Sequence, residues 1–107
     1  DISFIFPHQM KDIQNKSIDL TLAIDCIHEM DKKTIKYYFH QINKFSNLFY
    51  FSVLKKVIVL HSGIFAKTSN RLDYYSNDYP IPDNWKKTFE EEQIFPSNII
   101  SAGFELN

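Results

Sequence analysis

The chain has 107 residues, of which 44% are hydrophobic and 23% are charged. This size and composition are typical of one soluble globular domain, which we place at residues 1–107. With 12 basic and 13 acidic residues the net charge is −1, so no positive excess favours nucleic acid or an anionic membrane as a partner. The longest apolar runs, 48–54 and 57–60, are far shorter than the roughly 20 residues of a membrane-spanning helix.

Cys26 is the only cysteine, which excludes an internal disulfide and fits a reducing compartment. The apolar start at residues 2–6 has no basic leader before it and is interrupted by Pro7, so it lacks the pattern of a signal peptide. We therefore expect a cytoplasmic protein.

The first predicted element is a strand at residues 18–24, which is rich in apolar and β-branched residues and is expected to be buried on both faces. A helix capped by Asp31 is predicted next. Its apolar face repeats every three or four residues and consists of Ile35, Tyr38, Phe39, Ile42 and Phe45.

A turn at Ser46–Asn47 and a second interior strand at 48–54 are predicted after this helix. Strand, helix and strand form a βαβ unit, which implies a parallel sheet with a right-handed crossover. We therefore expect an α/β fold whose sheet is part of a Rossmann-like sheet.

The rest of the chain has a weaker pattern. Residues 57–65 can continue as a strand, and residues 68–82 are polar, rich in tyrosine and predicted to be a loop. Residues 85–95 fit either a short helix beginning after Asp83 or a solvated edge strand. Residues 99–106 are predicted to form a last strand, with Gly103 at a bulge or a close contact.

The segment from Asp25 to Asp31 carries the highest density of reactive side chains. Ligands bind outside the carboxyl ends of parallel strands, where this loop would lie. His28 is a candidate general base, and Asp25 or Glu29 would orient it or hold a substrate. In the alternative interpretation, His28 and Glu29 only solvate the approach to the helix.

Other site types find little support. A zincin motif would need histidine at Lys32, and Cys26 at the end of an apolar strand is expected to be inert. Lys55 and the lysine after it would lie at the same rim, as substrate contacts or as a solvated strand exit. Two glycines 40 residues apart cannot build a phosphate-binding loop.

Several segments together resemble the second half of class I S-adenosylmethionine-dependent methyltransferases: Asp1-Ile2, Phe6-Pro7, residues 17–20 and residues 23–30. The resemblance implies that Asp1 and Ile2 contact the adenine of the cofactor. It also implies that residues 18–24 are the fourth strand of that fold, that His28 and Glu29 lie in the loop after it, and that residues 48–54 are the fifth strand.

Within this superfamily the chain is most similar to sugar O-methyltransferases, because Phe-Ile-Phe-Pro-His-Gln, His-Glu-Met and Phe-Tyr-Phe-Ser-Val-Leu-Lys-Lys occur in order. The resemblance implies a sugar hydroxyl as the methyl acceptor and a final hairpin built from the segment at Trp85 and residues 99–106. The glycine-rich first loop of the family has no counterpart here, so the N-terminal cofactor-binding half is missing and this chain alone is expected to be inactive.

Two alternatives remain. The chain can be a non-catalytic module that pairs through an exposed sheet edge with a second copy or with a missing N-terminal half. It can also be a fragment of another Rossmann-like enzyme, such as a dehydrogenase. The mass of the particle in solution tests the first alternative, because a monomer at high concentration argues against a module that pairs through its sheet edge.

Overall fold

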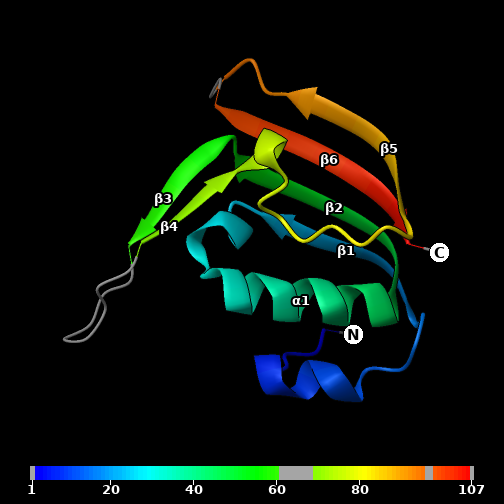
Figure 1. The fold of residues 1–107 in the computed structure, drawn as a ribbon. Coiled ribbons are helices and arrows are strands. Elements are labelled where there is room, and N and C mark those ends of the chain that lie inside the picture. The colour runs from blue at the N-terminus through cyan, green and yellow to red at the C-terminus, as the bar shows by residue number, and fades with distance from the viewer. Residues whose placement is uncertain (1, 61–68, 96–97, 107) are drawn as a thin grey trace.

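The computed structural model describes residues 2–60, 69–95 and 98–106 and shows a mixed α/β fold (Figure 1). A four-stranded sheet has the strand order β1-β2-β6-β5, and β3 and β4 form a separate two-stranded sheet. The strands are β1 (Ile18–Ile24), β2 (Ser46–Leu54), β3 (Lys56–Leu60), β4 (Ser69–Asp73), β5 (Trp85–Glu92) and β6 (Ile99–Leu106). The helix is α1 (Lys32–Phe45), and the short 3-10 helices are η1 (Pro7–Asp12), η2 (Ile27–Glu29) and η3 (Tyr74–Ser76).

The predicted βαβ unit is confirmed. Strands β1 and β2 pair in parallel, with Ile18 opposite Ser46, and α1 connects them. The side chain of Asp31 caps α1 by accepting a hydrogen bond from the backbone N–H of Thr34 at 2.7 Å. The predicted turn at Ser46–Asn47 is wrong, because β2 begins directly at Ser46, the C-cap residue of α1.

The second half of the chain departs from the prediction at several points. Strand β6, predicted in position, runs antiparallel between β2 and β5, so the sheet is mixed. Of the two alternatives left open for residues 85–95, the solvated edge strand is the one observed, because β5 lies at the edge of the sheet and is exposed after Trp85. The predicted loop at 68–82 is wrong in part, since it contains β4 and η3, and residues 61–65 of the predicted strand extension lie outside the described residues.

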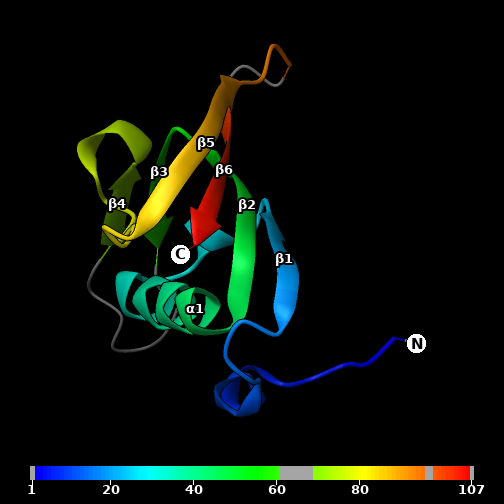
Figure 2. The same ribbon diagram turned by 90° about the vertical axis from the view of Figure 1, so that its right-hand side faces the viewer.

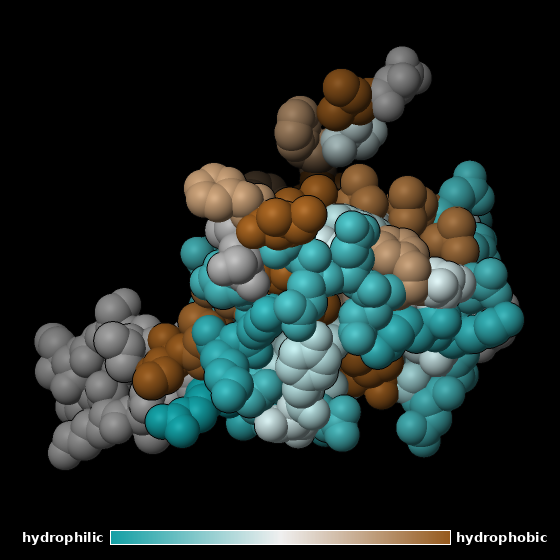
Figure 3. Space-filling view, turned by 90° about the horizontal axis from the view of Figure 1, so that it is seen from above, coloured by the Kyte–Doolittle hydropathy of each residue, from teal (hydrophilic) through white to brown (hydrophobic). Residues whose placement is uncertain are grey.

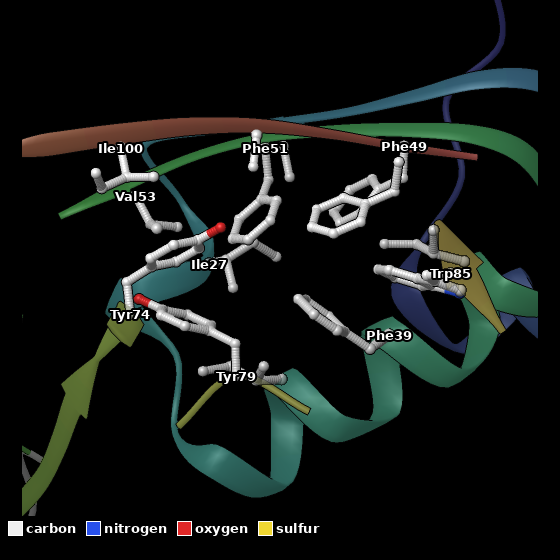
Figure 4. Packing of buried hydrophobic residues seen from close by; sticks show 14 of the residues in the cluster. Ile27, Phe39, Phe49, Phe51, Val53, Tyr74, Tyr79, Trp85 and Ile100 are labelled. Atoms are coloured by element: carbon white, nitrogen blue, oxygen red, sulfur yellow. The ribbon is translucent and has the colours of Figure 1, made fainter. Parts of the chain in front are cut away.

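Aromatic rings fill the core between α1 and the sheet (Figure 4). Phe39 of α1 stacks on Trp85 of β5 with ring centroids 5.3 Å apart, and it meets Phe49 and Phe51 of β2 edge to face. Because such pairs combine a large buried apolar area with a preferred geometry, this cluster fixes how α1 lies on the sheet. Of the predicted apolar face of α1, only Tyr38 is not fully buried.

The bounds predicted for β1 are confirmed, but its predicted burial on both faces is wrong. Leu20, Leu22 and Ile24 are 48%, 58% and 59% exposed. Strand β1 pairs with β2 only, at the edge of the sheet, and α1 covers the opposite face (Figure 2). Apolar side chains therefore gather at the surface on the side of the sheet away from α1 (Figure 3).

Candidate functional site

The carboxyl ends of three strands form one rim of the sheet. Strand β5 runs in the same direction as β1 and β2, because it pairs antiparallel with β6, which is itself antiparallel to β2. Asp25, His28 and Glu29 follow β1, Lys55 follows β2, and Glu92 ends β5. This is the location at which the sequence predicts chemistry.

Asp25 directly follows β1 and has a left-handed conformation, with φ of 55°. Its N–H donates to the carbonyl of Ser52 at 3.0 Å, which is the last backbone bond between β1 and the neighbouring strand. Aspartate adopts this region more readily than most residues, and the turn directs the chain out of the sheet toward η2. The residue is exposed, so its carboxylate is accessible at the rim.

His28 is buried, with 5% of its surface exposed, and its ring is held by the end of β2. The backbone N–H of Leu54 donates to Nδ1 at 3.3 Å. This bond requires an unprotonated Nδ1, so the neutral ring carries its proton on Nε2. In this state His28 is a hydrogen-bond donor at Nε2, and acting as a base there would require its proton to move first.

Cys26 and Glu29 lie beside His28. Burial raises the pKa of the Cys26 thiol, and the nearby carboxylates of Glu29 and Asp25 act in the same direction. The thiol is therefore harder to ionise than an ordinary cysteine, and its inert role stays a prediction. Glu29 is exposed and, with Asp25, places two carboxylates at this end of β1.

Lys55 is engaged in an ion pair. Its Nζ lies 2.7 Å from Oε2 of Glu92, and the hydroxyl of Tyr75 donates to Oε1 of the same carboxylate at 2.9 Å. The hydrogen bonds from Lys55 and Tyr75 hold the pKa of Glu92 below its usual value. Lys55 therefore joins β2 to β5 across the rim. Lys56 lies 3.7 Å from Asp73 and pairs β3 with β4.

A second Tyr–Glu–Lys group lies two residues earlier on β5, around Glu90, and it was not predicted from the sequence. Tyr74 donates to Oε1 of Glu90 at 2.5 Å, and Nζ of Lys87 contacts the same oxygen at 2.7 Å. The adjacent tyrosines 74 and 75 and the alternate glutamates 90 and 92 were the available signal. Finding it required knowing that η3 lies against β5.

The predicted adenine contacts are not brought to this rim. Asp1 lies outside the described residues, and Ile2 is 87% exposed. The N-terminal end of the chain lies near the amino end of β1, whereas Asp25 and His28 follow its carboxyl end (Figure 2). Hollows of about 280, 330 and 270 Å³ are lined by other residues, so none of these three includes Asp25, His28 or Glu29.

Comparisons with family models, curated protein sequences and solved structures gave no match to the chain. Within the described residues no three His, Cys, Asp or Glu side chains are grouped as metal ligands would be. In the same part of the chain no helix is long and apolar enough to cross a membrane.

Proposed function

We propose that this chain is the C-terminal part of a Rossmann-like, class I S-adenosylmethionine-dependent methyltransferase domain, which transfers a methyl group to a hydroxyl of a sugar. The observation that carries the proposal is the order of the sheet. Two parallel strands joined by α1 are followed by a hairpin whose last strand, β6, inserts antiparallel next to β2. The family resemblance implies a final hairpin at this place. The choice of a sugar rests on the resemblance only.

The exposed side of β1 also supports the proposal. Leu20, Leu22 and Ile24 form an apolar row on an edge strand, where unpaired backbone groups invite a further strand. A preceding half of the domain would pair with this edge and cover the row. Burying three such side chains stabilises a domain by several kcal/mol, at about 1.5–3 kcal/mol for each one that is fully buried.

The loop after β1 would meet the acceptor. The cofactor supplies the methyl group, and the acceptor hydroxyl must lose its proton. Asp25 offers an accessible carboxylate for that proton, and Glu29 offers a second one. His28, with Nδ1 held by Leu54, donates from Nε2 and orients the acceptor oxygen.

The described residues do not form a site for the cofactor itself. Ile2 can offer an apolar surface to adenine, but it lies away from the rim. The proposal assigns this chain the acceptor side of the reaction, so the groups that hold the cofactor belong to the preceding half.

An activity measurement tests the proposal. The chain is joined to the N-terminal half of the domain that the proposal requires, and transfer of labelled methyl from S-adenosylmethionine to a panel of sugars is measured. Asp25→Asn should lower turnover by about 10²-fold or more, as loss of a general base does. Asp12→Asn, an exposed change in η1, serves as the matched control. No transfer to any sugar, or full activity of Asp25→Asn, would contradict the proposed role.

The same edge favours a second candidate, a module that dimerises by pairing β1 with β1 of a second copy. The backbone N–H of Asp25 donates to the carbonyl of Ser52. The backbone N–H and C=O groups of odd-numbered residues in β1 therefore point toward β2, and those of even-numbered residues point toward the free edge. A two-fold axis at Thr21 then places Leu20 opposite the partner's Leu22, with apolar residues facing apolar residues.

Charge disfavours one neighbouring register. With the axis at Thr21, Asp19 lies opposite the partner's Ala23, whereas a shift of two residues toward the end of β1 places it opposite the partner's Asp25. Like charges directly opposite destabilise a strand pair. The two candidates exclude each other, because both use the same edge.

Cross-linking distinguishes the candidates. Thr21→Cys in a Cys26→Ser background places two cysteines across the two-fold axis in a non-hydrogen-bonded pair. The Cβ atoms of such a pair lie at the short end of the range of about 4.5–5.5 Å, which meets the upper limit of about 4.5 Å for a disulfide. The dimer predicts rapid oxidation to a cross-linked pair and twice the chain mass by light scattering. A monomer at high concentration with no cross-link would contradict it.

A further inference from the structure

A hollow of about 270 Å³ lies between α1 and the segment that leads from η3 to β5. In Figure 1 this segment is drawn in yellow and runs above α1. Trp85 begins β5 at this end of the strand, whereas the carboxyl-end rim lies at its other end, at Glu92. The residues that line the hollow are Lys36, Phe39, His40 and Asn43 of α1, and Pro80 and Pro82 of the connecting segment.

The connecting segment is held on the helix at both of its ends. Tyr79 and Trp85 are 3% and 7% exposed and belong to the core. The Oδ1 atom of Asn43 accepts hydrogen bonds from Nε1 of Trp85 at 2.8 Å and from Nδ2 of Asn84 at 2.9 Å. Each proline between these anchors also fixes its own φ angle. The hollow is therefore a built part of the fold.

The helix wall of the hollow carries two basic side chains. Lys36 and His40 are one turn apart on α1, so their side chains are neighbours on its surface. Both are exposed, and neither has a hydrogen bond or an ion pair with another described residue. Among the described residues that line the hollow none is acidic. An anion is therefore the charged group that this wall favours.

Asn43 adds a neutral donor to the same wall. Its Nδ2 donates to Oδ1 of Asn84 at 3.3 Å, and the second N–H of the amide has no partner within the described part of the chain. The bonds to Oδ1 of Asn43 fix which way this amide is turned. The neutral His40 ring also keeps one N–H, so it donates in either protonation state.

The rest of the wall is apolar. Pro80, Pro82 and Phe39 offer carbon surface and no side-chain donor. Ligand sites commonly combine an apolar lining with a few polar groups that fix the orientation of the ligand. Pockets for drug-sized ligands begin at about 300 Å³, so this hollow has room for about one ring.

We propose that this hollow binds a small organic carboxylate built on a single ring. The ring packs against Pro80 and Pro82, and the carboxylate accepts hydrogen bonds from Lys36, His40 and the Asn43 amide. A carboxylate has two oxygens with about four acceptor positions, which is enough for three donors. The site is separate from the rim, so it does not depend on the proposed methyl transfer.

A matched pair of probes tests this site. Benzoate and benzamide have nearly the same shape, and at about pH 7 only benzoate is an anion. Binding to the 107-residue chain is followed by NMR at the indole N–H of Trp85, the only tryptophan, which bonds to Asn43 on the wall. Benzoate should bind about fivefold more tightly than benzamide at low salt, as an exposed ion pair at the upper end of its range provides. This preference should shrink as salt is raised to about 1 M.

Substitutions locate the contact. In Lys36→Gln the preference for benzoate should fall to about twofold or less while benzamide binds as before, and Lys36→Arg should keep it. Lys11→Gln makes the same change of charge on η1, away from the hollow, and should also keep the preference. Equal binding of the two probes, a full preference in Lys36→Gln, or no binding of either probe up to about 10 mM would overturn the proposal.

Discussion

The ring of Phe89 lies directly over the backbone of Gly103. A Cβ atom at position 103 would lie 2.2 Å from Cε1 of Phe89, closer than any real contact. The register of β5 shifts between Lys87 and Phe89, and the ring also contacts Tyr50 with centroids 5.9 Å apart. Gly103 is therefore the close contact predicted from the sequence, and the irregularity lies in the facing strand.

This relationship predicts that Gly103→Ala destabilises the protein. The added methyl must displace the Phe89 ring, which costs about 1–3 kcal/mol as overpacking does. Phe89→Ala removes the obstacle, so Gly103→Ala should cost much less in that background. Denaturant unfolding of the two single variants and the double variant measures the coupling, and additive losses would contradict it.

Lys16 joins three segments through its ammonium group. Nζ donates to the carbonyls of Asn43 at 3.0 Å, Ser46 at 2.9 Å and Leu106 at 2.6 Å. Lys16→Met should lower the free energy of unfolding by about 2 kcal/mol, because hydrogen bonds from a charged donor are lost together. Lys32→Met, at the N-terminus of α1, removes a cation where the helix dipole disfavours it and should not destabilise. Equal losses in both variants would refute this role.

Acid should weaken the attachment of η3 to β5. The pKa values of Glu90 and Glu92 are held below their usual value of 4.5 by hydrogen bonds from lysine and tyrosine. In this range the folded state binds fewer protons than the unfolded chain, so the stability from these groups is full above about pH 4.5 and is lost as pH falls through the lowered values. The double variant Glu90→Gln and Glu92→Gln should show a shallower loss of stability between about pH 5 and 3, and an unchanged slope would contradict the account.

Two buried tyrosines should respond differently to loss of the hydroxyl. Tyr74 donates to Glu90, whereas the Tyr79 hydroxyl has no partner among the described residues. Tyr74→Phe should cost about 1–2 kcal/mol, and Tyr79→Phe should leave stability unchanged or raise it. Thermal unfolding of both variants checks this contrast, and a larger loss in Tyr79→Phe would be inconsistent with it.

High pH provides a test on the unmodified chain. Burial raises the pKa of both Tyr74 and Tyr79 well above the ordinary tyrosine value. The unfolded chain then loses protons before the folded one, so stability should fall as pH rises above about 10. Absorbance titration should show these two phenols ionising only together with unfolding. Ionisation of all six tyrosines near pH 10 in the folded state would contradict this.

The local pattern predicted the first half of the fold well. The bounds of β1, the Asp31 cap and the apolar face of α1 follow from spacing within a few turns of chain. The degree of burial of β1 did not follow from spacing, because an apolar strand can have the same composition at the centre and at the edge of a sheet. The position of a strand in a sheet is decided by pairing with distant segments.

The elements in the second half of the chain were hard to predict because they depend on pairing between distant segments. Strand β4 is polar and forms because it pairs with β3, and β5 is identified by β6 beside it. In the candidate site, the polar residues that follow β1 were singled out from the sequence, and their role stays a prediction. The bond from Leu54 to His28 and the tyrosine–glutamate pairs were not, since each joins segments that are separated in the chain.

Titration calorimetry with S-adenosylhomocysteine tests the central claim most directly. The isolated 107-residue chain should bind no more tightly than about 1 mM, or about −4 kcal/mol, because the described residues leave the polar groups of the cofactor unpaired. The chain extended by the N-terminal half that the proposal requires should bind at micromolar concentration. A micromolar dissociation constant for the isolated chain, or none for the extended protein, would contradict the account.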